Sequence, residues 1–413
     1  MTVSAEIIQH GIVRASSGRE RKRILVCTGS YLPGYKSGGP IRSIANLVVH
    51  LSPYFDFYVV TRDRDSTDTE HYPGVVPDKW DRVGSARVLY CSSVGFALLR
   101  RVVRVVQPDI IYLNSFQDVF TLISVVLRRG GAFGKIPTLL APRGEFSAGA
   151  LEIRGRKKAL YLRAAKLLGL HEDLHWQVTS LQEKRDLLQA APARLIDPDS
   201  IHLVGNICNA VASTAPHVAK IPGSLKLAFI SRMCEQKNLH FLLEVLREVR
   251  GAVLLSLFGP VTGKDVAYWK RCNAMLVQLP DNIQVDYRGS LDHPAVPQAL
   301  HDHHFFVLPT KGENFCHAAV ESFVNGTPVI LSDETPWLRL AEAKAGFDIS
   351  LSDRAGWVEA LQRCVDMDPQ TYALYLEGTA QYGRRFSTEE AALQHRSMFE
   401  AALCSNTNHK VRY

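Results

Sequence analysis

Two glutamates, Glu313 and Glu321, stand eight positions apart in the segment GENFCHAAVESFVNGTPVI, which covers residues 312–330. The residues between Phe315 and Val324 are mostly apolar, and Asn-Gly followed by Thr-Pro is typical of a helix that ends before a buried strand. The segment therefore predicts a helix that begins near Asn314 and contains Glu321. Eight helical residues rise about 12 Å, so the two carboxylates could contact the two ends of one elongated ligand.

Cationic and glycine residues predict that this ligand carries phosphate. Arg232 and Lys237 follow the strand-like run LAFIS, and two fixed cations stabilise a leaving group that gains negative charge. A helix N-terminus near Asn314 would offer unpaired N–H groups to an anion. Gly38-Gly39 would let the backbone approach a phosphate closely. Each feature alone also fits an ordinary helix acid, surface cation or turn, so the argument depends on their combination.

Three other patterns could indicate a metal site or a nucleophile. The sequence DRD at 63–65 matches the D-x-D of metal-dependent transferases, but we expect a solvated, acid-rich loop there. The run HDHH at 301–304 suggests zinc, yet no second ligand cluster lies near it in the sequence, so we expect no metal. Cys316 and His317 are adjacent, and adjacent helical side chains diverge by about 100°, which argues against a Cys-His nucleophile.

The elements that must position these residues alternate between strand-like and helical patterns. Alternation runs from Ile24 to about Leu203 and resumes at Leu225, which predicts two doubly wound parallel sheets. Ser387 and Glu390 have the spacing of a capping box at the start of a last helix. The predicted organisation is a polar tail at 1–22, a first domain at 23–205, a linker at 206–224, a second domain at 225–385, and a C-terminal helix and tail at 386–413.

The candidate residues follow predicted strands, where ligands of doubly wound sheets bind. Gly38-Gly39 come after the first strand and its loop, and the others follow strands of the second domain. They are Arg232, Lys237, Gly259, Pro260, Gly289, Ser290 and Glu313.

Composition favours a cytoplasmic, globular protein. The 413 residues are 46% hydrophobic and 22% charged, enough for two cores. The eight cysteines occur singly, without C-x-x-C or metal-ligand spacing, which is typical of reduced, buried thiols. No signal-peptide core and no membrane-spanning run is present. Nucleic-acid binding is disfavoured because the basic residues lack interleaved aromatics.

Charge is uneven along the chain. Residues 1–220 hold 29 Lys and Arg against 19 Asp and Glu, a balance of +10, whereas residues 221–413 have a balance of −3. The stretch LLRRVVRVV places Arg100, Arg101 and Arg104 near one helical face. The stretch RGRKKALYLRAAKLLGL puts Leu160, Ala164, Leu167 and Leu168 on one stripe, with Arg156, Lys158, Arg163 and Lys166 around it.

Such basic helices have two interpretations. They can lie on an anionic membrane surface, or they can bury the apolar stripe against a sheet and solvate their charges. We favour a peripheral enzyme at the inner face of the cytoplasmic membrane, because a soluble acceptor gives no reason for the charge asymmetry.

Five motifs occur in an order that resembles a known family: SGGPIRS, SRMCEQKN, FGP, VDYRGSL and the E-x7-E of Glu313 and Glu321. The chain resembles the retaining glycosyltransferases of family 4. That resemblance implies the α/β GT-B fold, with two doubly wound Rossmann-like domains facing across a cleft and a C-terminal helix returning towards the first domain. It implies transfer of a sugar from a nucleotide-diphosphate sugar, UDP- or GDP-linked, to a hydroxyl of a glycan acceptor, with no metal or other cofactor.

The resemblance also implies roles for the site residues. Glu321 would bind the ribose hydroxyls, while Glu313 and the backbone N–H groups of Asn314 and Phe315 would contact the sugar. Arg232 and Lys237 would clamp the diphosphate. Gly38, Gly39, Gly259, Pro260, Gly289 and Ser290 would complete the donor site. The departing phosphate would deprotonate the acceptor hydroxyl on the same face of the sugar, so that the anomeric configuration is retained.

The sequence departs from the family at one position. Many members carry a histidine after a strand of the first domain, where this chain has Asn114, Ser115, Arg143 and Glu145. We expect Asn114, Arg143 and Glu145 to contact acceptor or donor. Two other functions stay open: a GT-B sugar-nucleotide epimerase or phosphorylase, and a catalytically idle nucleotide-sugar-binding partner of another transferase. The favoured acceptor is a lipid-linked polysaccharide or glycoconjugate.

Overall fold

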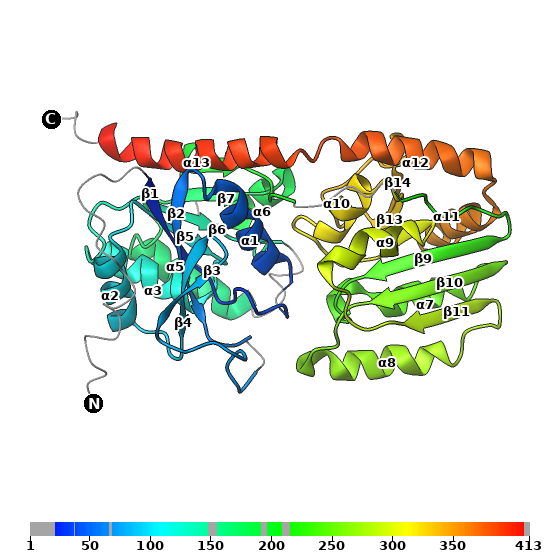
Figure 1. Cartoon of the computed structure of the whole chain (residues 1–413), viewed down its shortest axis with the longest axis horizontal. Coiled ribbons are helices and arrows are strands. Elements are labelled where there is room, and N and C mark those ends of the chain that lie inside the picture. The colour runs from blue at the N-terminus through cyan, green and yellow to red at the C-terminus, as the bar shows by residue number, and fades with distance from the viewer. Residues whose placement is uncertain are drawn as a thin grey trace. The chain divides into compact units, whose positions relative to one another are not determined.

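The computed structural model describes residues 21–36, 38–65, 68–147, 155–190, 196–208 and 215–408. The chain forms two compact units (Figure 1): unit 1 comprises Met1–Ile207 with Glu389–Tyr413, and unit 2 comprises Cys208–Thr388. Among the described helices, none combines the length and the apolar character needed to cross a bilayer. The predicted tail at 1–22 lies outside the described residues except for its last two.

Unit 1 contains an eight-stranded sheet with the order β3-β4-β2-β1-β5-β6-β7-β8. Its described strand pairs are parallel apart from β3 and β4, which form an antiparallel edge. Central strands such as β5 are buried along their whole length, because helices cover both faces of the sheet. The strands are β1 (Lys22–Cys27), β2 (Phe55–Arg62), β3 (Trp80–Val83), β4 (Ala86–Cys91), β5 (Ile110–Asn114), β6 (Thr138–Ala141), β7 (His175–Val178) and β8 (Ile201–Leu203).

Two groups of helices cover this sheet. Residues of α2, α3 and α5 share one apolar cluster with one face of the sheet, and residues of α1 and α13 share the cluster on the other face. The C-terminal segment from Glu389 onward thus belongs to unit 1, as the resemblance implies. The helices are α1 (Gly39–Leu51), α2 (Phe96–Val106), α3 (Val119–Arg129), α5 (Gly155–Leu167), α6 (Leu181–Ala190), the 3-10 turn η2 (Pro198–Ser200) and α13 (Thr388–Asn408).

Unit 2 contains a six-stranded, fully parallel sheet with the order β11-β10-β9-β12-β13-β14. The strands are β9 (Ser224–Ile230), β10 (Ala252–Phe258), β11 (Ile283–Tyr287), β12 (Phe305–Leu308), β13 (Val329–Ser332) and β14 (Gly346–Ile349). The helices are α7 (Leu239–Leu246), α8 (Val266–Leu276), α9 (Val296–His301), α10 (His317–Val324), α11 (Arg354–Asp366) and α12 (Pro369–Gly383), with 3-10 turns η3 (Glu235–Lys237), η4 (Gly263–Asp265) and η5 (His293–Ala295).

The later part of the predicted linker is packed onto unit 2. The backbone N–H of Val218 donates to the carbonyl of His301 at 2.9 Å. The buried Lys220 ammonium donates to the carbonyl of Val365, also at 2.9 Å. Residues 215–223 therefore behave as an edge of the second unit, not as a free connection.

Candidate functional site

The helix that carries Glu321 begins later than the sequence predicts. Helix α10 starts at His317, and its N-cap residue Cys316 has a left-handed backbone with φ 60°. A left-handed residue cannot continue a right-handed helix, so the expected start near Asn314 is wrong. Glu313 therefore lies in the loop before the helix, and the two glutamates do not occupy the ends of one helix. The predicted helix end is confirmed, since Asn325 caps α10 and Gly326 has φ 70°.

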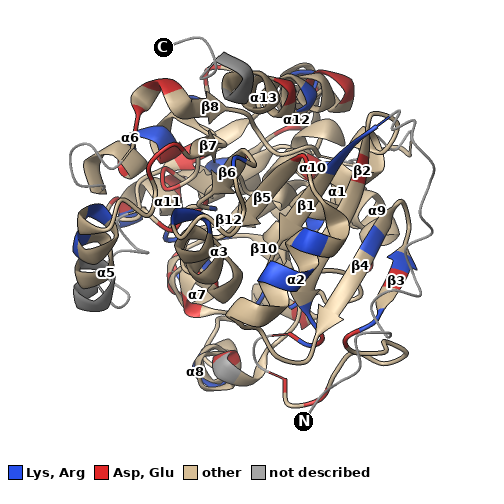
Figure 2. Cartoon of the chain, turned by 90° about the vertical axis from the view of Figure 1, so that its left-hand side faces the viewer, with Lys and Arg blue, Asp and Glu red and all other residues tan. Residues whose placement is uncertain are grey.

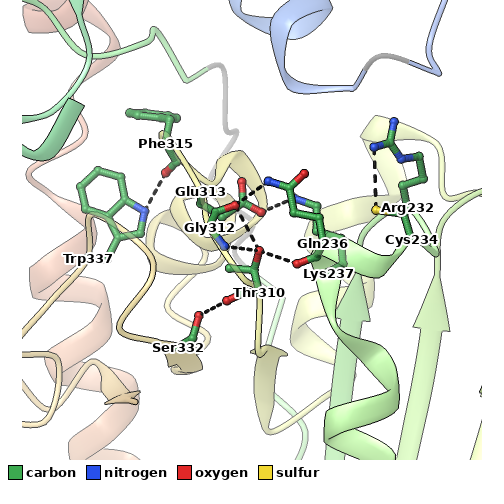
Figure 3. Close-up of polar contacts among 10 residues, drawn as sticks. All are labelled: Arg232, Cys234, Gln236, Lys237, Thr310, Gly312, Glu313, Phe315, Ser332 and Trp337. Atoms are coloured by element: carbon green, nitrogen blue, oxygen red, sulfur yellow. Dashed lines mark hydrogen bonds and ion pairs between the residues drawn. The ribbon is translucent and has the colours of Figure 1, made fainter. Parts of the chain in front are cut away.

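Neighbouring strands bring the loops after β9 and β12 together. The side-chain amide of Gln236 donates to the carbonyl of Gly312 at 2.9 Å. The hydroxyl of Thr310 donates to the carbonyl of Gln236 at 3.1 Å, and Ser332 in turn donates to the carbonyl of Thr310 at 2.6 Å. Figure 3 shows these bonds as one network around Lys237 and Glu313. The loops hold each other in place before any ligand binds.

Lys237 and Glu313 form an ion pair within this network (Figure 3). Their side chains are only 18% and 13% exposed. Burial opposes the charge on Lys237, but the Glu313 carboxylate outweighs it and holds the pKa of Lys237 above its ordinary value. The lysine therefore stays protonated, and it provides a fixed cation next to a carboxylate.

Arg232 is oriented by a carboxylate that sequence reasoning missed. Its Nε lies 3.6 Å from Oδ2 of Asp265, and its Nη2 lies 3.8 Å from the Sγ of Cys234. The hydroxyl of Thr262 donates to the same Asp265 oxygen. The only sequence signal for this support is the polar pair Thr262 and Asp265 shortly after the FGP motif.

Gly259 allows three loops to meet. It has φ 141°, and a Cβ there would lie 1.9 Å from the carbonyl oxygen of Ser231, so no other residue fits. Its N–H donates to the carbonyl of Gly289 at 2.7 Å, and the N–H of Met233 donates to the carbonyl of Pro260 at 3.1 Å. The structure thus brings together the predicted residues that follow β9, β10 and β11, with Ser290 exposed beside Gly289.

Glu321 contacts His293, which, like Asp265, the sequence analysis did not identify. Its Oε1 lies 3.3 Å from Nε2 of His293, whose side chain is 43% exposed, whereas Glu321 itself is buried. His293 follows Gly289 and Ser290 by a few residues, so its place next to a predicted loop was the available signal. Before the helix, Phe315 is buried and its carbonyl accepts from Nε1 of Trp337 at 2.8 Å; Asn314 is partly exposed.

In unit 1, Gly38 precedes α1, and a Cβ on it would meet no atom within 4 Å. Gly39 is the first residue of that helix. Asp65 fixes the preceding loop, because it accepts from the backbone N–H groups of Tyr35 and Lys36, both at 3.3 Å.

The expectation that Asp63 and Asp65 lie in a solvated loop is wrong, since both are 2% exposed. Asp63 pairs with Arg64 at 2.8 Å. The hydroxyl of Tyr72 donates to Asp65 at 3.1 Å. These bonds compensate for the burial of the two carboxylates.

Arg143 and Asn114 belong to a hydrogen-bond network at the carboxyl edge of the first sheet. The guanidinium donates to Oδ1 of Asn114 through both Nε and Nη2, to Oδ1 of Asn206 at 2.6 Å, and to the hydroxyl of Tyr112 at 2.9 Å. Glu145 accepts from the N–H of Gln117 at 2.7 Å and from the hydroxyl of Ser115. These hydrogen bonds fix the side chains of Asn114, Arg143 and Glu145 at the carboxyl edge of the first sheet.

The histidine run has structural partners, and Cys316 is a buried thiol. His301, His303 and His304 are buried, and their ring nitrogens bond to the carbonyls of Asn325, Ala299 and Ala219 respectively. Burial raises the pKa of the Cys316 thiol, which keeps it protonated. Within the described ranges, no group of three His, Cys, Asp or Glu is placed to hold a metal ion.

Comparison with known proteins adds a family match for unit 2. Residues 224–367, which include the described loops after β9 to β12, match the family model described as Glycosyl transferases group 1. No curated protein matches the chain.

Solved structures match nearly the whole chain at low identity. A sucrose-phosphate synthase from Thermosynechococcus elongatus matches with a TM-score of 0.72 and 17% identity over 93% of this chain and 100% of that one. Anabaena HepE in complex with UDP-glucose matches with a TM-score of 0.66 and 16% identity over 92% and 99%. WaaG, a glycosyltransferase involved in lipopolysaccharide biosynthesis, matches with a TM-score of 0.62 and 12% identity over 91% and 98%.

The two mostly parallel sheets, the C-terminal segment that belongs to unit 1 and these nearly full-length matches agree. The chain has the two-domain α/β fold of the GT-B glycosyltransferases, and its second unit contains a region that matches the glycosyl transferases group 1.

Proposed function

We propose that this chain is a retaining glycosyltransferase of the family 4 type, which moves a sugar from a nucleotide-diphosphate sugar to a hydroxyl of a glycan. The observation that carries the proposal is the cluster of Arg232, Lys237 and Glu313 at the carboxyl edge of the second sheet. Parallel sheets of this kind bind ligands at that edge, and the cluster lies inside the segment that matches the glycosyl transferases group 1 model.

The donor would lie along the loops of unit 2. Glu321, whose Oε1 lies 3.3 Å from Nε2 of His293, has the character needed to accept hydrogen bonds from ribose hydroxyls, because it is a buried carboxylate. Gly259 and Gly289, whose loops are joined by a hydrogen bond of 2.7 Å, would line the nucleoside side of the site. The HepE complex with UDP-glucose supports a UDP-sugar as the first donor to try, with a GDP-sugar as the alternative.

Charge accounts for the chemical step. As the bond between sugar and phosphate breaks, negative charge grows on the diphosphate, and Arg232 and Lys237 stabilise it without a metal ion. Lys237 is already protonated and fixed by Glu313. When the Lys237 ammonium also contacts the diphosphate, the Glu313 carboxylate can accept a hydrogen bond from a hydroxyl of the sugar. The departing phosphate would remove the proton of the acceptor hydroxyl on the same face.

The acceptor would lie at the carboxyl edge of the first sheet, beside Asn114, Arg143 and Glu145. The glycine loop at Gly38 and Gly39, fixed by Asp65, belongs to the same unit. A lipid-linked glycan at the inner face of the cytoplasmic membrane fits the excess of 29 basic over 19 acidic residues in the first 220. The likeness to WaaG, which is involved in lipopolysaccharide biosynthesis, supports this acceptor class.

The stereochemistry of the product tests this proposal. The full chain is incubated with UDP-glucose and a small panel of other nucleotide sugars, with lipid-linked and soluble glycans as acceptors, and the new anomeric centre is assigned by nuclear magnetic resonance. We expect an α-linked product from an α-linked donor. Inversion of the linkage, or isomerisation of the nucleotide sugar without an acceptor, would contradict the proposal.

A further inference from the structure

Helix α5 presents leucines to solvent. Leu160 and Leu167 are 70% and 87% exposed, and Leu168, directly after the helix, is 57% exposed. Residues seven apart project in nearly the same direction from a helix, so Leu160 and Leu167 form one ridge, with Ala164 between them also exposed. Single exposed leucines are ordinary, but a ridge of them on one helix is not.

The residues of this ridge do not pack into the hydrophobic core. Helix α5 is attached to unit 1 by its opposite face, where Leu162 and Ala165 are buried in the cluster that contains Phe116 and Trp176. Tyr161 extends this anchorage, because its ring packs edge-on against Phe116 and its hydroxyl lies 3.2 Å from Nε2 of His171. Of the two interpretations of the stripe, burial against the sheet is therefore wrong.

The ridge is bordered by positive charge. Arg163 and Lys166 are exposed on α5, and residues 153–171 contain six basic and no acidic side chains in the sequence. Arg129, at the end of α3, donates to the carbonyl of Leu168 at 3.0 Å, and its half-exposed guanidinium also pairs with Glu172 at 3.4 Å. Figure 2 shows α2, α3 and α5 on one side of the molecule, each carrying Lys or Arg.

This combination matches one kind of partner. Apolar side chains that enter the boundary between headgroups and acyl chains, flanked by Lys and Arg that reach lipid phosphates, are the features of an interfacial helix. The sequence of α5 itself contains basic and no acidic residues, which favours an anionic partner over a basic one.

We propose that the outward face of α5, formed by Leu160, Arg163, Ala164, Lys166, Leu167 and Leu168, binds the surface of an anionic lipid bilayer. The segment with Arg143 and Glu145 follows β6 and precedes α5 in the chain, and contact of α5 with lipid would suit a membrane-borne acceptor. The inference rests on the proposed function only for this choice of acceptor.

Vesicle sedimentation tests it with the full chain. Vesicles of phosphatidylcholine alone are compared with vesicles that also contain phosphatidylglycerol, at low and high salt. We expect binding to the mixed vesicles at low salt and weaker binding at high salt. The double variant Leu160→Ser/Leu167→Ser should bind about tenfold more weakly or worse, and Arg163→Gln and Lys166→Gln should each cost about fivefold.

The matched control is Val277→Ser, because Val277 is 87% exposed, as Leu167 is, but lies in unit 2. It should bind vesicles as the unchanged chain does, and all variants should keep their thermal unfolding midpoint. Failure of the chain to bind mixed vesicles at low salt would overturn the proposal. So would equal binding by the leucine variant and the control, or a self-association that the leucine variant abolishes without any vesicle binding.

Activity on a soluble acceptor separates the two proposals. Sugar transfer without vesicle binding would refute the membrane face alone. Vesicle binding without any sugar transfer would support the membrane face and refute the proposed function.

Discussion

Lys237 and Glu313 form an ion pair that joins the loops after two neighbouring strands, β9 and β12. The two residues are 76 positions apart in sequence, and they meet because a crossover places their strands side by side. The pair holds the cation proposed for the diphosphate next to the carboxylate proposed for the sugar. A donor that binds here would contact both members of the pair. Lys237 would then lie on the diphosphate side of the bond that breaks, and Glu313 on the sugar side.

Loss of Lys237 should affect turnover and stability differently. Lys237→Ala should lower kcat by about a hundredfold or more, since a fixed charge in such a site contributes roughly 3 kcal/mol to transition-state stabilisation. It should also lower the free energy of unfolding, because it leaves the Glu313 carboxylate without its cation in a mostly buried position.

The double variant Lys237→Ala/Glu313→Gln separates the two effects. It should recover part of the lost unfolding free energy, measured in urea, but none of the lost turnover. Recovery of activity together with stability would show that the pair is structural only. Arg232→Ala should reduce turnover to a similar extent, and a loss below about threefold would contradict the clamp, given the expected magnitude of such a contact.

The two glutamates should differ in what they do. Glu321→Ala should weaken nucleotide diphosphate binding about tenfold or more while the bound donor still reacts, and Glu313→Ala should mainly lower kcat, because we propose that Glu321 contacts the nucleotide and Glu313 the reacting sugar. His293→Ala should weaken nucleotide binding less than Glu321→Ala, since its side chain is more exposed. Calorimetric titration with the nucleotide diphosphate and steady-state kinetics measure these two quantities. Unchanged binding and turnover in both glutamate variants would remove them from the site.

Activity should survive chelation. In the proposed function, Arg232 and Lys237 supply the positive charge that a metal ion would otherwise provide, so turnover in excess EDTA should stay within about twofold of that without it, the scale of an indirect effect. Loss of turnover in EDTA, restored by manganese, would assign a metal-binding role to Asp63 and Asp65, whose carboxylates already have protein partners.

Acid should destabilise the chain through His395. This residue of α13 is buried, and burial lowers its pKa to about 4. Its Nδ1 bonds the carbonyl of Ala391 at 2.9 Å, and its Nε2 lies 3.2 Å from Nε2 of Gln177, which must donate. Between pH 6.5 and 4 the unfolded chain takes up a proton that the folded chain does not, so the free energy of unfolding falls by about 2 kcal/mol from pH 7 to pH 5.

Replacement of His395 by Gln should remove that share of the pH dependence. Urea unfolding of both proteins at pH 7 and pH 5 gives the comparison, and the difference between the two pH values should shrink in the variant. An unchanged difference would mean that His395 is already protonated in the fold.

The sequence predicts the layout of the fold well, because hydrophobic alternation is a local signal. The stretch LLRRVVRVV, for example, lies in α2, as its helical pattern predicts. The half-exposed antiparallel strand β3 and the short strands β7 and β8 leave little periodicity in the sequence, so their bounds come from the structure alone. Helix α10 begins three residues late because a left-handed residue, Cys316, has no distinctive sequence signature.

The candidate site could be predicted only in part. Residues on loops that follow strands were found from their motifs, but their partners come from distant segments: Asp265 beside Arg232, and His293 beside Glu321. Asp63 and Asp65 were expected in solvent because their neighbours are acidic, but Arg64 pairs with Asp63, and Tyr35 and Tyr72 donate hydrogen bonds to Asp65. The sequence could not show whether the leucine stripe of α5 is buried or exposed. In the structure the opposite face of the helix, with Leu162 and Ala165, packs into the core.

Binding of nucleotide sugars to the full chain tests the central claim most directly. A panel of UDP-, GDP- and ADP-sugars is titrated by calorimetry against the unchanged chain and the double variant Arg232→Ala/Lys237→Ala, in EDTA. The account predicts one class of nucleotide sugar that binds the unchanged chain at one site and binds the double variant about a hundredfold more weakly or worse, the effect of losing two charge contacts. Absence of binding to any nucleotide sugar, or equal binding by the double variant, would contradict it.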